Sequence, residues 1–197
     1  TKAEVVLLQH LQAALIKLNP NMPPEAITSA LDSLTRDRSA MSLEAANREV
    51  CLLMKEGLTV SIPELDKGGQ NTERIHVIDW ENPINNDLLL VSQMSITGQL
   101  YTRRPDLIGF VNGLPLVVIE LKKPGVPAKN AFDENLTCYK ADFPKLFWYN
   151  ALMIASNGSE SHVESLTADW KCFFEWKRIC LVHAVWPIPL WGISMIS

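Results

Sequence analysis

Cysteine is scarce in this sequence, which has only four among 197 residues and no Cys-x-x-Cys pair. Disulfide-stapled secreted domains and structural zinc sites need denser or more regular cysteine spacing, so we expect neither. The four histidines are scattered without an HxxxH spacing, which disfavours a zinc or Cys–His catalytic site. The forms GxxxxGKS/T, GxSxG and GxGxxG are also missing, so the sequence has no phosphate-binding loop, nucleophile elbow or dinucleotide fingerprint.

A surplus of positive charge is missing too. The chain has 18 basic and 22 acidic side chains and a formal net charge of −4, which excludes a polybasic nucleic-acid coat but not a local basic patch. One basic window exists, because residues 101–145 hold seven basic and five acidic side chains. Its members are Arg103, Arg104, Lys122, Lys123, Lys129, Lys140 and Lys145. The window is either a solvated surface or part of a nucleic-acid site.

The longest stretch without charge is residues 179–197, which is long enough to cross a bilayer. Pro187 and Pro189 lie in its middle and would break a membrane-spanning helix, so we expect no membrane contact. The segment is either an apolar strand and turn of the core or a tail of different origin, and we expect one domain over residues 1–178. The N-terminal apolar run covers only residues 5–8, too short for a signal peptide. This indicates a reducing, cytoplasmic location.

Three amphipathic helices are predicted in the first third of the chain. Leucines recur every three to four residues over residues 7–18, and this pattern stops before Pro20. Pro24 opens a second helix that runs to residue 34. Ser42 can cap a third helix, which ends before Gly57. Beyond this glycine the apolar period changes from 3.6 to about 2, which indicates strands.

The clearest strand signal lies in residues 105–122, where two β-rich runs flank an Asn-Gly pair. This dipeptide is the strongest short-range hairpin signal. The second run is apolar at nearly every position, so we expect a central strand covered on both faces. Further strands are predicted at 74–78, 88–91 and 152–155, and a helix at 128–140. Together these elements predict an α/β fold with a mixed sheet flanked by helices.

The hairpin carries the side chains that could take part in catalysis. Asp106 lies on its first strand, and Glu120 and Lys122 lie at the end of its second, where alternation points both the same way. A plain two-residue loop would pair Asp106 with Ile119 and leave Glu120 on the opposite face. A three-residue loop ending in Gly113, or an equivalent bulge, would place Asp106, Glu120 and Lys122 on one face. We predict the odd-length loop or such a bulge.

Two carboxylates on one face with a nearby lysine are suited to metal-assisted phosphodiester hydrolysis. Carboxylate oxygens are ligands that Mg²⁺ prefers, and the ion lowers the pKa of a bound water and neutralises charge on the phosphate. Lys122 can then stabilise the transition state electrostatically. Without a cation the carboxylates would repel a DNA phosphate. The spacing alone is weakly specific, and a strand that simply ends in charged residues is the commoner explanation.

The stretch RRPDLIGFVNGLPLVVIELKKP resembles the nuclease motif of the restriction (R) subunit of type I restriction–modification enzymes, members of the PD-(D/E)xK nuclease superfamily. The likeness extends over roughly residues 5–178 and includes LNPNMPPEAI and HVIDWENPINNDLLLVSQ. It implies a restriction-endonuclease-like fold and Mg²⁺-dependent cleavage of double-stranded DNA. It also implies that Asp106 and Glu120 bind the metal and that Lys122 completes the catalytic set.

The resemblance implies further supporting residues. These nucleases often carry a Gln-x-x-x-Tyr element on the following helix, and the matching positions here are Asn135 and Tyr139, which share one helix face. Asparagine keeps the amide but shortens its reach, and Tyr139 could instead serve helix packing alone. Arg104 and Lys123 flank the hairpin motif and are expected to support the site or contact DNA.

The chain also departs from the family in ways that shape the expected function. Family members begin with a further helical segment that includes an acidic residue, and we expect this chain to lack it. No ATP-driven translocase motif is present, so ATP is expected only in a full-length subunit. The resemblance implies methyltransferase and specificity subunits as partners. The alternative is a non-catalytic fragment that binds DNA or assembles with other subunits, and binding of a divalent ion separates the two.

Overall fold

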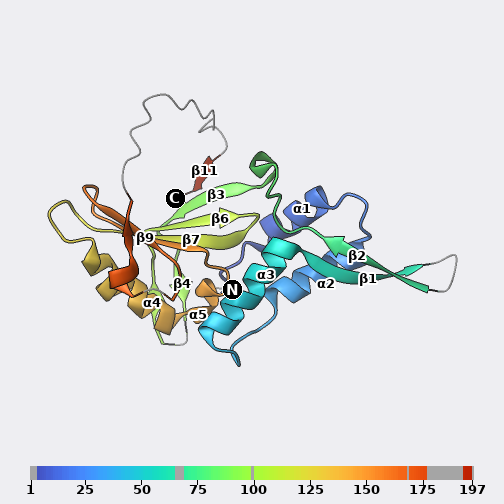
Figure 1. Ribbon diagram of the computed structural model, residues 1–197, viewed down its shortest axis with the longest axis horizontal. Helices are drawn as coiled ribbons and strands as arrows, with labels where there is room; N and C mark the ends of the chain where they lie inside the picture. The colour runs from blue at the N-terminus through green and yellow to red at the C-terminus, as the bar shows by residue number, and fades with distance from the viewer. Residues whose placement is uncertain (1–3, 65–68, 99, 168, 177–192, 197) are drawn as a thin grey trace.

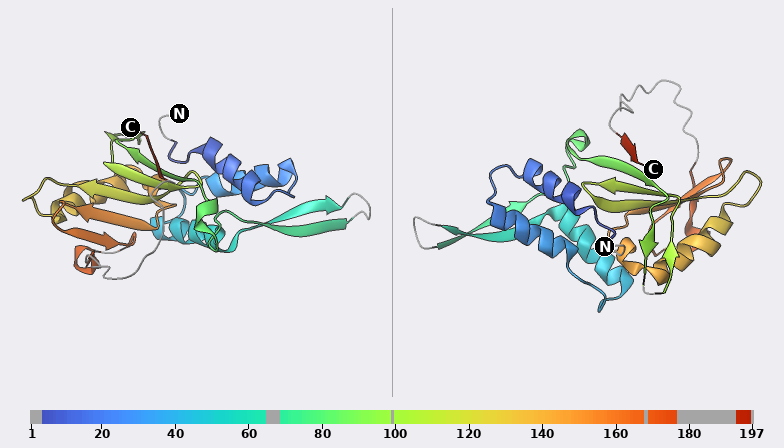
Figure 2. Two further views of the ribbon diagram at one scale, coloured as in Figure 1. Left: turned by 90° about the horizontal axis from the view of Figure 1, so that it is seen from above. Right: turned by 180° about the vertical axis from the view of Figure 1, so that it is seen from behind.

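The computed structural model describes residues 4–64, 69–98, 100–167, 169–176 and 193–196. Its centre is a seven-stranded mixed sheet, with a group of helices at one end and a second helical segment along one face (Figure 1). A two-stranded ribbon extends from the helical end away from the sheet (Figure 2). The predicted mixed sheet flanked by helices is confirmed.

Helices form the first third of the chain, as predicted. They are α1 (Leu8–Leu18), α2 (Pro24–Thr35) and α3 (Leu43–Glu56). The Ser42 hydroxyl accepts a hydrogen bond from the Ala45 backbone N–H at 3.2 Å and caps α3. Gly57 follows with φ +80°, a left-handed conformation that glycine adopts without strain. Local sequence therefore determines where these helices begin and end.

The strands of the central sheet pair in the order β10-β9-β8-β7-β6-β3-β11. Their bounds are β3 (Leu88–Ser92), β6 (Leu107–Val111), β7 (Leu114–Leu121), β8 (Leu152–Ser156), β9 (Ser161–Glu164), β10 (Phe174–Glu175) and β11 (Ile193–Ile196). The β7–β8 and β3–β11 pairs are parallel, and the other pairs are antiparallel. β7 is a central strand, as predicted, but Val117 and Ile119 on one of its faces are only half-buried.

Several further elements were predicted only in part or not at all. They are β1 (Leu58–Glu64), β2 (Gly69–Ile75), β4 (Ile96–Thr97), β5 (Thr102–Arg103), η1 (Pro83–Asn85) and η3 (Trp170–Cys172). β1 and β2 form the extended ribbon, and β4 and β5 form a small hairpin between β3 and β6. The strand predicted at residues 74–78 is wrong beyond Ile75, because β2 ends there.

The hairpin of β6 and β7 has a two-residue turn and a bulge. Val111 pairs with Leu114, so the predicted three-residue loop is wrong. The register then shifts, and Leu116 is the extra residue on β7, because Phe110 pairs with Pro115 while Gly109 pairs with Val117. Beyond the bulge, pairing continues to the start of β6. The predicted bulge is therefore confirmed. It places Glu120, at the far end of β7, on the same face of the hairpin as Asp106.

The turn of this hairpin is anchored to the rest of the molecule. Asn112 has φ 52° and Gly113 has φ 77°, which are the two left-handed positions of a type I′ turn. The Gly113 carbonyl accepts a hydrogen bond from the Leu7 N–H at 2.9 Å, just before α1. The Asn112 side chain is 1% exposed and donates to the Val77 carbonyl at 2.8 Å. The turn thus fixes the hairpin against the helical end.

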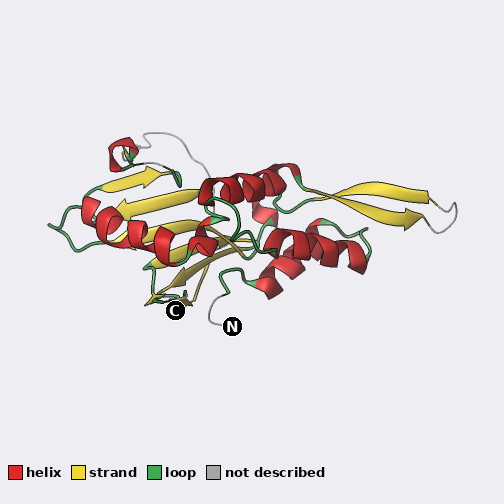
Figure 3. Cartoon of the chain, turned by 90° about the horizontal axis from the view of Figure 1, so that it is seen from below, coloured by secondary structure: helices red, strands yellow, loops and turns green. Residues whose placement is uncertain are grey.

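A helical segment follows the hairpin and lies against the sheet at β7 and β8 (Figure 3). It consists of a π-helix, η2 (Ala131–Leu136), and the α-helices α4 (Thr137–Asp142) and α5 (Pro144–Phe147). Four aromatic residues at its end are buried: Phe143, Phe147, Trp148 and Tyr149. They pack in the core.

The apolar segment predicted from residue 179 onward lies mostly outside the described residues. Its described part, β11, pairs in parallel with β3 at the edge of the sheet. Across the described ranges, no helix combines the length and the hydropathy that a membrane span requires.

Candidate active site

Three side chains lie in a row across adjacent strands at one end of the sheet. The last β3–β6 pair joins Ser92 to Leu107, and the last β6–β7 pair joins Leu107 to Ile119. If this pairing is continued by one residue along each strand, Asp106 lies between Gln93 and Glu120. The Asp106 carbonyl accepts a hydrogen bond from the Gln93 N–H at 3.0 Å, and the Asp106 N–H donates to Glu120 Oε1 at 3.1 Å. The structure brings the two predicted carboxylates together.

Both carboxylate oxygens of Asp106 accept hydrogen bonds. Oδ1 accepts from the side-chain amide of Gln93 at 2.7 Å, and Oδ2 accepts from the Leu121 N–H at 2.8 Å. The carboxylate is therefore held from two neighbouring strand ends. Since each oxygen has more than one lone pair, these contacts leave acceptor capacity for a cation.

Glu120 is the buried member of the pair. Its side chain is 2% exposed, and this burial, together with the neighbouring charge of Asp106, raises the pKa of Glu120 to about 7. Hydrogen bonds from the Asp106 N–H and the Tyr139 hydroxyl favour the charged form and only partly offset the rise. A second negative charge at this position is therefore costly unless a cation compensates for it.

Lys122 lies on the same side of the strand end and is engaged by η2. Its Nζ contacts Glu134 Oε2 at 2.8 Å and Asn135 Oδ1 at 2.8 Å. The Asn135 amide in turn donates to the Tyr139 hydroxyl at 3.3 Å, and that hydroxyl is hydrogen-bonded to Glu120. A continuous chain of polar contacts therefore connects the predicted lysine to the predicted glutamate.

Tyr139 combines the two roles that the sequence left open. It is 3% exposed and stacks on Phe143 with ring centroids 5.3 Å apart, which is helix packing. Its hydroxyl also reaches Glu120, and burial raises the pKa of Tyr139 above its ordinary value. The hydroxyl thus stays protonated at neutral pH and acts as a hydrogen-bond donor to the carboxylate.

The basic window divides into paired and exposed residues. Arg103 forms an ion pair with Asp142 at 2.9 Å, and Lys129 forms one with Asp133. Arg104 and Lys123 are exposed on either side of the carboxylates in the sequence, and Arg104 Nε donates to the Ser95 hydroxyl at 3.0 Å. Acidic side chains of the same window therefore engage Arg103 and Lys129.

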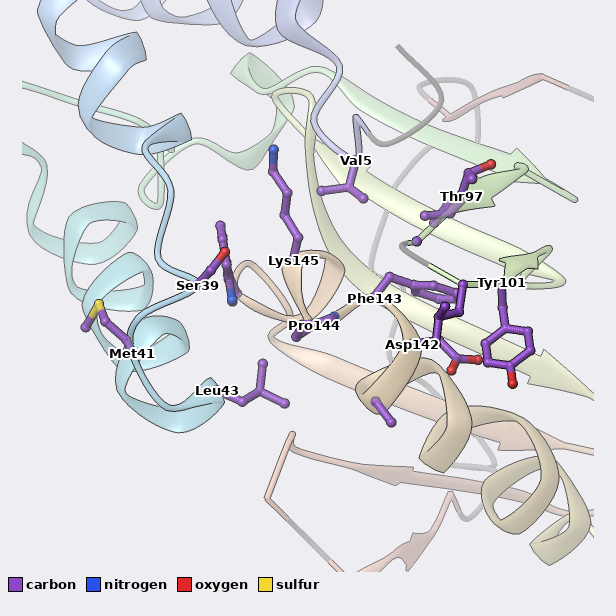
Figure 4. A pocket seen from close by; sticks show the side chains of 15 residues that line it. Val5, Ser39, Met41, Leu43, Thr97, Tyr101, Asp142, Phe143, Pro144 and Lys145 are labelled. Carbon is purple, nitrogen blue, oxygen red and sulfur yellow. The ribbon is translucent and has the colours of Figure 1, made fainter.

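A hollow of about 560 Å³ lies elsewhere, between the small β4–β5 hairpin, the start of α3 and the α4–α5 junction (Figure 4). Tyr101, Asp142, Phe143 and Lys145 are among its lining residues, and Asp106, Glu120 and Lys122 are not. The carboxylate pair instead lies at the open end of the sheet. Within the described ranges, no group of three or more His, Cys, Asp or Glu side chains could hold a metal, so the candidate site offers two carboxylates.

Two contacting residues, Gln93 and Glu134, were missed from the sequence. Gln93 follows a predicted strand, but its approach to Asp106 depends on the pairing of β3 with β6. Glu134 precedes Asn135 on the π-helix η2, and both contact Lys122. Only the strand register and the helix type, neither of which has a clear sequence signal, would have identified them.

These features define an α/β protein with a paired-carboxylate site at one end of its central sheet. Residues 1–171 match the family described as the N terminus of the type I restriction enzyme R protein, and the chain belongs to that family. The resemblance recognised in the sequence is thus confirmed.

Relatives of known name support this assignment. The chain is 37% identical over 179 residues to the type I restriction enzyme HindI endonuclease subunit of Haemophilus influenzae, covering 89% of this chain and 17% of the relative. It is 35% identical over 121 residues to a putative type I restriction enzyme MjaIXP endonuclease subunit of Methanocaldococcus jannaschii, covering 58% and 11%. The chain therefore spans only about a sixth or less of the length of these two relatives.

Proposed function

We propose that this chain is the Mg²⁺-dependent endonuclease module of a type I restriction enzyme R subunit, with a restriction-endonuclease-like (PD-(D/E)xK) fold. The observation that carries the proposal is the adjacency of Asp106 and Glu120, with Lys122 linked to the same site. Family membership supports a nuclease role in general. The geometry supports Asp106, Glu120 and Lys122 as the residues of the proposed site.

The donor set fits a hard divalent cation. Two carboxylates from neighbouring strands meet at one place, and oxygen is the ligand type that Mg²⁺ prefers. The raised pKa of Glu120 indicates that negative charge is uncompensated there. Mg²⁺ prefers to keep several waters and needs few protein ligands, so Asp106 and Glu120 suffice as its protein ligands.

Each residue then has a distinct role. Asp106 and Glu120 would hold the ion, which when bound supplies charge neutralisation at the phosphate and a more acidic water. The Lys122 ammonium, linked to the carboxylates through Asn135 and Tyr139, would stabilise charge that develops on the phosphate. Asn135 holds the Lys122 ammonium, and Tyr139 donates to Glu120. Arg104 and Lys123 would contact the DNA backbone, where basic side chains contribute affinity without sequence readout.

The whole enzyme would cut double-stranded DNA after ATP-driven translocation. ATP binding and translocation would belong to a motor outside this chain, and methyltransferase and specificity subunits would supply the target. Three of the seven basic residues in the window, Arg103, Lys122 and Lys129, are held in ion pairs, which suits a module whose DNA is delivered by partners. Such a complex would act in the cytoplasm.

The proposal is tested by titrating Mn²⁺ into this chain and by assaying Mg²⁺-dependent nicking of supercoiled plasmid. We expect the wild type to bind the ion and Glu120→Ala to lose both ion binding and nicking. Glu81→Ala, at an exposed position away from the site, should behave like the wild type in both. A wild type that binds no divalent ion, or a Glu120→Ala variant that binds as well as the wild type, would favour a non-catalytic assembly fragment.

A further inference from the structure

Gln93 contacts Asp106 through both its backbone and its side chain. Its N–H donates to the Asp106 carbonyl at 3.0 Å, and its Nε2 donates to Asp106 Oδ1 at 2.7 Å. Besides this amide, the Asp106 carboxylate accepts a hydrogen bond from the Leu121 backbone N–H at 2.8 Å and lies against the Glu120 carboxyl. Gln93 therefore supplies the side-chain amide that orients this carboxylate from the end of β3.

The backbone of Gln93 is unusual. Its φ is +52°, and within the described ranges Asn112 is the only other non-glycine residue with positive φ. A left-handed conformation is unfavourable for residues with a Cβ, and glutamine lacks the short side chain that lets asparagine adopt it readily. Gln93 is also exposed, so core packing does not impose the conformation. Such outliers persist where surrounding contacts require them and cluster at functional sites.

We propose that Gln93 is a positioning residue, whose side-chain amide fixes the Asp106 carboxylate in the orientation that binds a divalent cation together with Glu120. This inference rests on the proposed function, because the ion belongs to it. The physical basis is preorganisation. A carboxylate held by a hydrogen bond need not lose rotational freedom when the ion binds, and partners of metal ligands strongly affect metal affinity for this reason.

If Gln93 had only a structural role, Gln93→Gly would have the opposite effects on stability and on ion affinity. Gln93→Gly removes the amide but adopts positive φ without strain, so it should keep or raise the stability of the metal-free protein. If the residue merely closes the end of the sheet through its side chain, the same substitution should lower stability and leave the ion affinity unchanged. Gln93→Asn tolerates the same backbone, but its amide is one methylene shorter.

The test is calorimetric titration with Mn²⁺, together with thermal unfolding in EDTA. We expect Gln93→Gly to weaken Mn²⁺ binding by about tenfold, as is typical for loss of a ligand's hydrogen-bond partner, with a thermal midpoint at or above the wild-type value. Gln93→Asn should weaken binding in the same direction. Gln12→Ala, at an exposed glutamine on α1, is the matched control and should change neither measurement.

Glu120→Ala separates the inference from the proposed function. If Glu120→Ala abolishes Mn²⁺ binding while Gln93→Gly and Gln93→Asn bind like the wild type, the positioning role is wrong and the proposed function stands. A clear drop in the thermal midpoint of Gln93→Gly without a change in affinity also overturns the positioning role. If the wild type binds no Mn²⁺, or Glu120→Ala binds it normally, the proposed function fails and the inference fails with it.

Discussion

The Lys122 ammonium contacts Asn135 Oδ1 and Glu134 Oε2 at the same distance of 2.8 Å. These two partners are consecutive residues of η2, and they differ in charge and in exposure. Glu134 is 57% exposed, whereas Asn135 is partly buried and also donates to Tyr139. The lysine is therefore held by an exposed ion pair and by a neutral amide that belongs to the site.

The two partners should contribute unequally to stability. Glu134→Ala removes an ion pair whose carboxylate is well solvated, so the free energy of unfolding should change by less than about 1 kcal/mol. Asn135→Ala removes one hydrogen-bond partner from Lys122 and one from Tyr139 at a partly buried position, and should cost about 1–2 kcal/mol. Urea denaturation of both variants measures the difference. A larger loss for Glu134→Ala than for Asn135→Ala would contradict this assignment.

We expect Gly113 to tolerate no side chain, because a Cβ there would clash with the start of α1 as well as strain the backbone. A Cβ at Gly113 would lie 2.5 Å from the Leu7 carbonyl oxygen and 2.7 Å from the Leu11 nitrogen. Gly125 is the matched control, because its φ of +88° is similar and nothing lies within 4 Å of its Cβ position. We expect Gly125→Ala to cost about 1 kcal/mol from backbone strain and Gly113→Ala to cost more than about 2 kcal/mol, as measured by chemical denaturation. Equal losses would show that the contact with the start of α1 is unimportant.

Much of the fold was predictable where local chemistry decides it. Ser42 and Gly57 mark the ends of α3, and the apolar run before Glu120 marks a central strand. Asn112 and Gly113 mark the hairpin turn. From the sequence, two registers of the hairpin were possible, and only one of them brings Asp106 close to Glu120. The sequence could not decide between them, because the bulge at Leu116 has no sequence signal of its own.

The rest of the site depends on contacts between distant segments. Gln93 faces Asp106 only because β3 pairs with β6 in one register. Glu134 contacts Lys122 from η2, a π-helix, and this helix type is rare enough that periodicity favours an ordinary α-helix. The β1–β2 ribbon was predicted only in part, because β1 shows the two-residue apolar period expected after Gly57, whereas β2 is polar up to Arg74 and gives little apolar alternation.

Asn112 should be among the costliest polar residues to replace. Its side chain is 1% exposed, donates to the Val77 carbonyl and to Asn86 Oδ1, and accepts from the Asp87 N–H, each at 2.8 Å. Asn112→Ala would take these hydrogen bonds from the Val77 carbonyl and the Asp87 N–H and would also place alanine at φ 52°. We expect a loss of about 2–4 kcal/mol in the free energy of unfolding.

Asn112→Gly isolates the hydrogen-bond contribution of that residue. Glycine removes the same contacts but accepts positive φ, so it should cost about 1 kcal/mol less than alanine. Both variants are compared by urea denaturation. If alanine and glycine cost the same, backbone strain contributes nothing at this turn; if both cost nothing, the buried network around Asn112 does not stabilise the fold.

Glu120 should make the stability of the metal-free protein depend on pH. Its pKa is about 7 in the folded chain, above the ordinary value of about 4.3 for an unfolded glutamate. The folded state therefore binds the proton more tightly, and the resulting stability is fully present below about pH 4.3 and is lost as pH rises toward 7. Glu120→Gln cannot lose a proton, so it should lack this contribution to the pH dependence.

The measurement is urea denaturation from pH 4 to 8 in EDTA. The free energy of unfolding of Glu120→Gln relative to the wild type should grow with pH and level off above about pH 7 at roughly 3 kcal/mol, as a shift of this size implies. Saturating Mg²⁺ should recover the lost stability of the wild type above pH 7, because a cation favours the charged carboxylate, and should do little for Glu120→Gln. A pH-independent difference between the two proteins would mean that Glu120 is charged at little cost, and that burial beside Asp106 creates no demand for a cation.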